Sequence, residues 1–172
     1  MGEIHIRPEA EMRDDARAAF DEHRERVLGL VPSAEVEHVG STSVPGALTK
    51  GDVDVLVRVR PDDFDAAVIA LRSRYAVHQP ANWTPTLASF AEPGAADPPV
   101  GIQLVVAGST DDALFGPFRD ALIRDPDLLA EYNALKRHYD GSDYRRYTDI
   151  KGRFVERVLR EPGVAPSRPT RG

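Results

Sequence analysis

The chain has 172 residues, a net charge of −6 and no cysteine, and 41% of its residues are hydrophobic while 29% are charged. These values are typical of one globular domain that can bury a core. They exclude disulfides, thiolate catalysis and cysteine-based zinc sites. The acidic charge argues against polynucleotides and membrane surfaces as partners, because both select a basic face. No apolar run reaches membrane-spanning length and the N-terminus is too polar for a signal peptide, so we expect a cytoplasmic protein.

Periodicity and turn residues predict the elements of the fold in chain order. They are a short edge strand around Ile4 and Ile6, a helix over 8–30, a strand over 35–39, the central strand over 52–59, a helix over 61–74, a short strand over 75–77, strands over 86–91 and 101–107, a helix over 111–124, a helix capped by Asp125 and running to His138, and a helix over 142–161. Strands fill the middle and helices the two ends. This order predicts an α+β fold, a mixed β-sheet with helices packed against it. We expect a single domain over 1–160 and a disordered tail over 161–172.

The most informative segment is GSTSVPGALTKGDVDVLV, residues 40–57. Its second half reads as a strand, and in a strand residues two apart point to the same face. Asp52 and Asp54 therefore project together, while Val53, Val55 and Val57 face the opposite way. Two adjacent carboxylates repel each other unless a cation lies between them, and hard oxygen ligands suit Mg²⁺ or Mn²⁺. We therefore expect a metal site at this pair.

A Gly-Ser turn precedes the acidic strand. Its backbone N–H groups and the hydroxyls of Ser41 and Ser43 form a small concavity that suits phosphate. Gly40 and Gly46 meet backbone requirements of this turn and of the connection that follows. Lys50 lies two residues before Asp52, where it either contacts phosphate or balances the charge of the aspartate. A phosphate cradle beside a dicarboxylate metal site is the equipment of a phosphoryl or nucleotidyl transferase.

This spacing resembles that of the nucleotidyltransferase superfamily, which has the DNA polymerase beta-like fold. The superfamily pattern is Gly-Ser, about ten residues, and a strand that reads acid–hydrophobic–acid, as in Gly40-Ser41 and Asp52-Val53-Asp54 here. The longer string EHVGSTSVPG, residues 37–46, resembles the GrpB family (UPF0157), whose small proteins are placed in that superfamily. The resemblance implies a nucleotidyltransferase-like fold.

The resemblance to the GrpB family continues downstream to about residue 158. Phe118-Arg119-Asp120 is similar to the family's FRD, Glu131-Tyr132 with Lys136 to a helix motif, and Tyr147 with Lys151 to a terminal Y-x-x-x-K. If the C-terminal helices pack beside the open edge of the sheet, Arg119, Lys136 and Lys151 form a basic wall that holds a triphosphate, with Arg119 as an accessory residue.

Lys50, Lys136 and Lys151 are the only lysines of the chain, and the resemblance expects a lysine at each. A compact ammonium group binds phosphate as a point charge, which the fork of an arginine does less well in a narrow space. The alternative for Lys136 and Lys151 is an ordinary exposed position on a helix.

The third strand of the site departs from both family patterns. Active nucleotidyltransferases place a third acid there, and GrpB proteins tend to show a His-x-His pair, whereas this chain has Gly101 and Gln103 at those positions. Gln103 can form a hydrogen bond with a metal-bound water or a sugar hydroxyl but cannot take up a proton at neutral pH. Glu92, at the end of the preceding strand, is an alternative third acid. His38 is either a metal ligand or proton carrier, or a buried hydrogen-bonded histidine.

Two hypotheses about function follow. The first is a Mg²⁺-dependent nucleotide-binding protein that transfers a nucleotidyl group to a hydroxyl of a small molecule or a protein, with a nucleoside triphosphate or another phosphorylated small molecule as ligand. The second is a non-catalytic binding or regulatory module, which Gln103 in place of an acid or a histidine favours. The oligomeric state is open in both.

Overall fold

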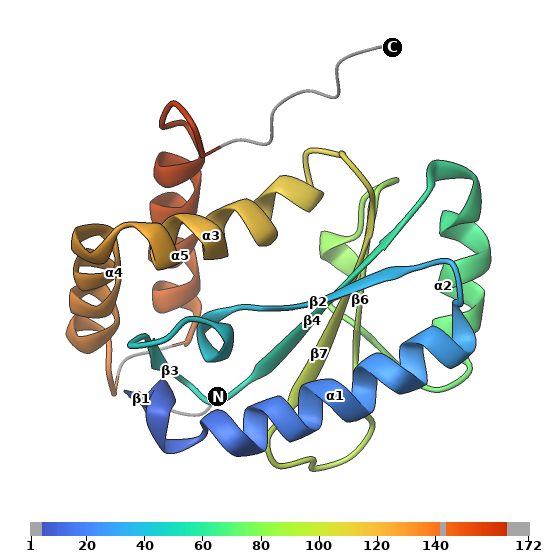
Figure 1. Cartoon of the computed structure of the whole chain (residues 1–172), viewed down its shortest axis with the longest axis horizontal. Helices are drawn as coiled ribbons and strands as arrows, with labels where there is room; N and C mark the ends of the chain where they lie inside the picture. Colours follow the sequence, from blue (N-terminus) through green and yellow to red (C-terminus); the bar gives the residue numbers. More distant parts are fainter. Residues whose placement is uncertain (1–4, 142–143, 165–172) are drawn as a thin grey trace.

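The computed structural model describes residues 5–141 and 144–164, and it contains a mixed five-stranded sheet (Figure 1). The strand order is β2 (Glu35–Val39), β4 (Val53–Val59), β7 (Val100–Val106), β6 (Leu87–Ala91) and β5 (Ala76–His78). β4 and β7 run parallel, and every other neighbouring pair is antiparallel. The predicted α+β class with a mixed sheet is therefore confirmed.

One face of the sheet is covered by helices α1 (Arg13–Leu30) and α2 (Phe64–Arg72). Val53, Val55 and Val57 of β4 are fully buried in the core between this face and the two helices. Because side chains alternate along a strand, the even-numbered positions of β4 point to the other face. The largest apolar cluster of the protein thus lies on the side of the sheet away from the two aspartates.

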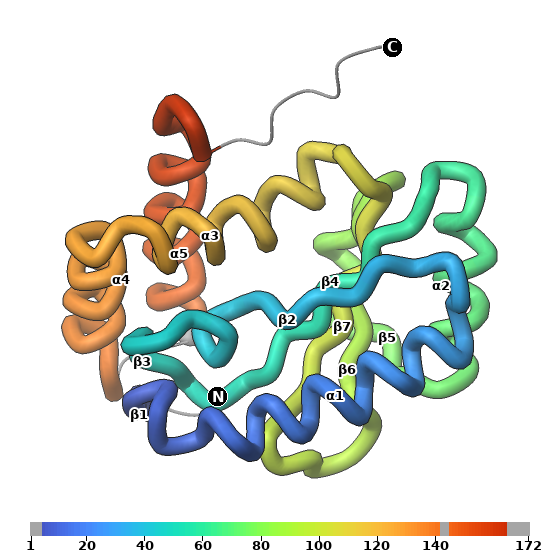
Figure 2. The backbone as a smooth tube through the Cα atoms, viewed as in Figure 1, coloured from blue at the N-terminus to red at the C-terminus, as the bar shows by residue number. Residues whose placement is uncertain are grey.

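The other three helices pack mainly against one another. They are α3 (Gly116–Arg124), α4 (Pro126–His138) and α5 (Tyr144–Leu159). Phe118, Tyr132 and Phe154, one from each helix, form an aromatic cluster, in which the rings of Tyr132 and Phe154 stack with centroids 5.2 Å apart. In the view of Figure 2, β2 and β4 run between α1 and α3, so the sheet has helices on both sides.

The N-terminal boundary of the first helix differs from the prediction. Arg7–Pro8 forms a two-residue strand, β1, which pairs with β3 (Leu48–Thr49). A 3-10 turn, η1 (Glu9–Glu11), follows, and α1 begins only at Arg13. The expected strand at Ile4 and Ile6 is wrong for Ile6, whose N–H donates to Oδ1 of Asp140 at 3.1 Å instead. Ile4 lies outside the described residues.

Proline and glycine shorten two other predicted helices. The helix expected over 61–74 begins as the 3-10 turn η3 (Pro61–Asp63) before α2, and the helix expected over 111–124 divides into η5 (Asp112–Leu114) and α3. In α3 the break precedes Gly116-Pro117, because proline fits the first turn of a helix but not its interior. Ser142, the expected start of the last helix, lies outside the described residues, as does the expected tail from residue 165 onward.

The other boundaries agree within one or two residues, which is the usual uncertainty of helix and strand ends. The cap of α4 forms as predicted: Oδ1 of Asp125 accepts from the N–H groups of Asp127 and Leu128 at 3.0 and 3.1 Å. The strand β3 and the turns η2 (Ser41–Ser43) and η4 (Pro80–Asn82) were not anticipated either. Among the helices of the described residues, none has both the length and the apolar character needed to cross a membrane.

Candidate functional site

The two aspartates lie on the face of the sheet that α1 and α2 leave uncovered. Asp54 belongs to β4, and Asp52 directly precedes this strand on the same side. Both carboxylates line a cavity of about 400 Å³ between the sheet and the C-terminal helices. Seven further residues that the sequence had indicated line the same cavity: Ser41, Lys50, Gly101, Gln103, Lys136, Tyr147 and Lys151.

Asp54 is a half-buried carboxylate that accepts no hydrogen bond from the described residues. Burial raises its pKa, the ammonium of Lys151 opposes this shift, and the charge of Asp52 adds to it. A buried carboxylate is costly unless a cation or donors compensate its charge. Asp54 therefore has the properties of a ligand for a cation.

Asp52 is more exposed and already has a cationic partner. Its side chain is 44% exposed, and its Oδ2 lies 2.7 Å from Nζ of Lys50. Lys50 thus balances the charge of Asp52 in this structure, which was one of its two expected roles, while it also lines the cavity.

Lys136 is buried rather than exposed on its helix. Only 1% of it is accessible, and its ammonium donates to Oγ of Ser41 and to the carbonyl of Leu48. The ammonium also lies 4.1 Å from the ring centroid of Tyr132. Burial lowers the pKa of Lys136 well below its usual range, and Lys151 and Lys50 act in the same direction. Lys136 therefore ties the Gly-Ser turn to α4.

Lys151 reaches the cavity from α5. It makes no hydrogen bond or ion pair with the residues in 5–141 and 144–164, although its charge lowers the pKa of Asp54. Among the three lysines, this ammonium is the one whose donors are available to an anionic ligand.

The Gly-Ser turn depends on Gly40 in two ways. Its φ of +75° lies in the left-handed region, and a Cβ atom there would lie 2.2 Å from Oδ2 of Asp54. Ser41 faces the cavity, whereas Ser43 donates its hydroxyl proton to the carbonyl of Gly40 at 2.6 Å and does not line the cavity. Gly46 also has a positive φ of +81°. The turn is thus built for close approach to the aspartate.

The third-strand residues face the site, as their alignment predicted. Gly101 pairs with Asp54 across β4 and β7, and Gln103 lies two residues further along the same face. Oε1 of Gln103 accepts from Oγ of Ser89 at 2.7 Å, which leaves its Nε2 as the free donor. Glu92 does not line the cavity and binds Arg74 at 2.7 Å on another part of the surface.

His38 lies outside the cavity. Its ring stacks on Phe20 with centroids 5.0 Å apart, and its Nε2 lies 3.0 Å from Oγ1 of Thr42. Thr42 donates its only proton to the carbonyl of Asp52, so Nε2 of His38 carries the hydrogen that bonds to Thr42. Burial lowers the pKa of His38 to about 4, and the charge of Arg119 adds to this shift. His38 is thus a neutral histidine that supports the Gly-Ser turn through Thr42, outside the cavity.

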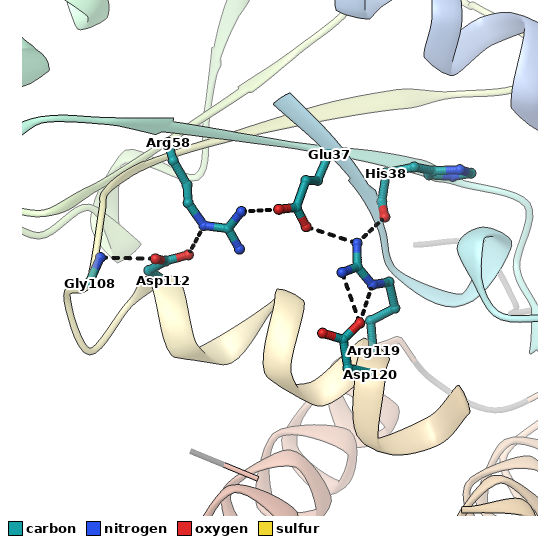
Figure 3. Close-up of polar contacts among 7 residues, drawn as sticks. All are labelled: Glu37, His38, Arg58, Gly108, Asp112, Arg119 and Asp120. Carbon is teal, nitrogen blue, oxygen red and sulfur yellow. Dashed lines mark hydrogen bonds and ion pairs between the residues drawn. The ribbon is translucent and has the colours of Figure 1, made fainter. Parts of the chain in front are cut away.

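Arg119 belongs to a chain of charges between the sheet and α3 (Figure 3). Its Nη1 donates to the carbonyl of His38 at 2.9 Å and lies 3.0 Å from Oε2 of Glu37, and its Nε donates to Asp120 at 2.8 Å. The other carboxylate oxygen of Glu37 contacts Arg58.

This network of charged side chains continues beyond Arg58. Nε of Arg58 donates to Oδ1 of Asp112 at 2.5 Å, and Oδ2 of Asp112 accepts from the N–H of Gly108 at 3.0 Å. Arg58, Asp112 and Arg119 are at most 19% exposed at their side chains. The network joins α3 to β2 and β4, and it positions the turn rather than contacting a ligand in the large cavity.

Sequence reasoning missed the residues that close the cavity opposite the lysines. They come from the segment that runs from β5 through η4 to β6: His78, Gln79, Asn82, Leu87, Ser89 and Ala91. The region over 80–100 holds many prolines and no clear periodicity, so the pattern did not indicate which side chains would meet the aspartates. Gln79 has a φ of +42°, unusual for a residue other than glycine.

Asn133 was also missed, although it holds the connection after the turn. Its amide accepts from the N–H of Leu48 at 2.8 Å and donates to the carbonyl of Gly46 at 2.9 Å. The signal was present: Asn133 and Lys136 are three residues apart on the face of α4 that carries Tyr132, so two polar residues share a buried helix face.

A second, smaller cavity of about 90 Å³ meets the first at the aspartate. Ser41, Asp54 and Lys151 line both cavities. The remaining lining of the small cavity is mostly apolar and includes Phe115 and Leu122. Asp54 is therefore accessible from two sides.

The donor set fits Mg²⁺ or Mn²⁺ as a partial site. Asp52 and Asp54 would hold the ion, and a cation between them would compensate the unpaired carboxylate of Asp54. Within the described residues, no group of three or more histidine, cysteine or acidic side chains is arranged to hold a metal. Mg²⁺ commonly binds through one or two carboxylates, with substrate phosphates and waters as its other ligands.

The fold and the cavity define an α+β protein with paired carboxylates and lysines in one pocket. Residues 10–161 match the family model described as GrpB protein, and the chain belongs to the GrpB family. A UPF0157 protein of Vibrio cholerae is 36% identical over 135 residues, which cover 77% of this chain and 70% of that protein. A UPF0157 protein of Streptomyces coelicolor is 32% identical over 161 residues, which cover 88% and 82%.

A solved structure shares the fold of this chain. The crystal structure of the conserved protein GrpB from Enterococcus faecalis superposes with a TM-score of 0.68 at 18% identity, over 89% of this chain and 93% of that one, which shows a shared fold. A structure of Cid1, described by its RNA terminal uridylyl transferase activity, superposes with a TM-score of 0.41 at 14% identity, over 69% of this chain and 40% of that one. A score this low does not support a functional comparison.

Proposed function

We propose that the protein binds the Mg²⁺ complex of a phosphorylated small molecule, with a nucleoside triphosphate as the first candidate. The observation that supports this most directly is the half-buried carboxylate of Asp54, which accepts no hydrogen bond from the described residues, beside Asp52 in a cavity that also holds three lysines. Acidic and basic groups in one pocket suit a ligand that is itself a metal–phosphate pair.

Each residue has a role in this proposal. Asp52 and Asp54 hold the ion, which offsets the charge of the phosphates when bound. Lys151 donates to a phosphate oxygen, because its ammonium has no partner among the described residues. Ser41 offers its hydroxyl at the mouth of the turn, and Lys136 fixes the position of that hydroxyl from within the core.

The same site supports nucleotidyl transfer, in which a hydroxyl oxygen of a small molecule or a protein bonds to the α-phosphorus of the NTP, pyrophosphate leaves, and the hydroxyl proton passes to solvent. Transfer requires that an acceptor reach the phosphate held near Asp54, and the small cavity offers a second approach to this residue. A binding module without turnover is the second candidate. Gly101 and Gln103 favour it, because neither can act as a base at the position where a third acid is expected.

The direct test is thermal unfolding with each of the four NTPs, in Mg²⁺ and in EDTA. At a ligand concentration 100 times Kd we expect about 2.7 kcal/mol of stabilisation, which raises the melting temperature by several degrees. The increase should be much smaller in EDTA, because the aspartates repel phosphate when no cation bridges them. No increase with any NTP in Mg²⁺ or Mn²⁺ would refute nucleotide binding.

The double variant Asp52→Asn/Asp54→Asn provides the matched test of the site. It keeps the shape of both side chains and removes both charges. We expect the metal-dependent increase to vanish while the free protein stays as stable as the wild type or becomes more stable. Asp62→Asn, at a residue whose side chain is 87% exposed, is the control and should behave as the wild type. Unfolding of the double variant would instead indicate a structural role for the pair.

A further inference from the structure

The floor of the large cavity is one face of the sheet, and its chemistry changes from strand to strand. Asp54 of β4 pairs with Gly101 of β7, which pairs with Ala91 of β6. All three line the cavity. The two smallest amino acids, glycine and alanine, thus occupy the two strands next to Asp54. They leave space above the middle of the sheet for a flat group.

A parallel row of polar residues crosses the same strands. Gln103 of β7 pairs with Ser89 of β6, which pairs with His78 of β5. Ser89 holds Oε1 of Gln103, so that Nε2 of Gln103 lies 3.8 Å from where a Cβ of Gly101 would be. This donor therefore points over the empty middle of the floor.

Beyond the edge of the sheet, the side-chain amides of Gln79 and Asn82 extend this row of polar residues into a wall of the cavity. Nδ2 of Asn82 donates to Oε1 of Gln79 at 3.1 Å. The bond leaves Nε2 of Gln79 and Oδ1 of Asn82, one donor and one acceptor, without a partner among the described residues. Both residues are exposed and line the cavity.

The loop that carries these amides is anchored. The indole N–H of Trp83 donates to the carbonyl of His78 at 3.0 Å, and the Trp83 ring packs on Phe90 with centroids 5.4 Å apart. Gln79 holds a left-handed backbone conformation that costs energy for a side-chain-bearing residue and persists only where its surroundings enforce it. The backbone that carries the amide pair is thus held in place.

We propose that this wall, Gln79, Asn82 and the row from Gln103 to His78, binds the base of a nucleotide whose phosphates lie at the Asp52/Asp54 end. The ligand is then a nucleoside phosphate rather than a polyphosphate or a simple phosphate ester. A base edge carries donors and acceptors side by side, which matches the free donor of Gln79 and the free acceptor of Asn82. This inference rests on the proposed function, because it needs the phosphates at the aspartates.

The dimensions of the floor agree with this ligand. Three strand spacings separate β4 from β5, and each spacing is about 4.8 Å, so the floor extends about 14 Å from the aspartates to the amide wall. The acidic side chains and lysines of the lining lie at one end, near β4, α4 and α5, and the opposite wall consists of amide, hydroxyl, imidazole and apolar side chains. A ligand with an anionic end and a neutral hydrogen-bonding end fits this division.

The experiment compares tripolyphosphate with the four NTPs, all in Mg²⁺, by calorimetric titration of the full chain. The test variant is Gln79→Gly/Asn82→Ala. Glycine accepts the positive φ of position 79, so the backbone is relieved while both amides are removed. The single variant Asn82→Ala, at an exposed residue, covers the case in which the double variant unfolds. Arg60→Ala, an exposed residue that does not line the cavity, is the control.

We expect the wild type to bind at least one NTP more tightly than tripolyphosphate. In the double variant this NTP should bind about tenfold more weakly or worse, as expected for the loss of two hydrogen bonds, while the affinity for tripolyphosphate stays within about twofold. Asn82→Ala should show a smaller loss of the same kind. Unchanged NTP affinity in both variants would overturn the inference.

Two results with the wild type separate this inference from the proposed function. If tripolyphosphate binds as tightly as every NTP, the base site is refuted while metal–phosphate binding at the aspartates stands. If neither tripolyphosphate nor any NTP binds in Mg²⁺, the proposed function fails, and the base site fails with it.

Discussion

A Cβ atom on Gly101 would lie 3.5 Å from Oδ1 of Asp54, at ordinary van der Waals distance. Position 101, rather than 103, is therefore the neighbour of the half-buried carboxylate across the parallel strands β4 and β7. Its backbone has no positive φ, so a side chain can be placed there without strain. A third acid in this site belongs at residue 101.

The first prediction is that Gly101→Asp tightens Mg²⁺ binding and destabilises the metal-free protein. A third carboxylate near two others is tolerated only when a cation is present. We expect at least a tenfold gain in Mg²⁺ affinity by calorimetry, and a loss of about 1–2 kcal/mol in EDTA by urea unfolding. Gly101→Asn has the same shape without the charge, so both its gain in Mg²⁺ affinity and its loss of stability in EDTA should be smaller. Equal Mg²⁺ affinity in the two variants would contradict this placement of the site.

The second prediction concerns Gly40, whose φ is +75°. Gly40→Ala should cost about 2–4 kcal/mol, because backbone strain adds to a clash of 2.2 Å with Asp54. Gly108→Ala is a matched control with a φ of +74° and no atom within 4 Å of the added Cβ. Its cost should be about 1 kcal/mol, from backbone strain alone. Urea unfolding measures both values, and equal losses would show that Asp54 yields to the added methyl group.

The third prediction separates stability from binding at Lys136. Lys136→Met keeps most of the volume and removes a buried ammonium, so the free protein should unfold at the same or a higher temperature. Ligand affinity should fall, because Ser41 loses the contact that fixes its hydroxyl. Thermal unfolding with and without Mg²⁺–NTP measures both effects. A strongly destabilised variant that binds NTP with wild-type affinity would mean that Lys136 serves the core alone.

The fourth prediction is a pH dependence from His38. Its folded pKa of about 4 lies below the unfolded value of 6.5, so the unfolded state takes up the proton first. Its contribution to stability is complete above pH 6.5, decreases as the pH falls, and is lost below about pH 4. The loss is at most about 3.5 kcal/mol, because the two pKa values differ by about 2.5 and one pKa unit corresponds to about 1.4 kcal/mol.

The variant His38→Gln isolates this effect. It retains a donor for Thr42 and cannot be protonated, so its free energy of unfolding should depend less on pH between 6.5 and 4 than that of the wild type. Carboxylates that titrate in the same range contribute equally to both proteins. Parallel pH profiles for the two proteins would show that His38 is accessible to protons in the folded state.

The sequence by itself determined the parts of this protein that depend on neighbouring residues. Alternation along β4 places Asp52 and Asp54 opposite the buried valines, and the cap at Asp125 starts α4, because both follow from local backbone geometry. The string over 37–46 indicated the GrpB family, and the family match over residues 10–161 confirms it.

Only the tertiary structure decided which residues share the cavity. Lys136 was compatible with an exposed helix until α4 packed against the Gly-Ser turn, and Gln79 and Asn82 lie in a stretch without periodicity. The need for glycine at position 40 depends on its approach to Asp54, fourteen residues later in the chain. The reason is physical: these positions depend on packing between distant segments, which periodicity and turn signals along one segment do not report.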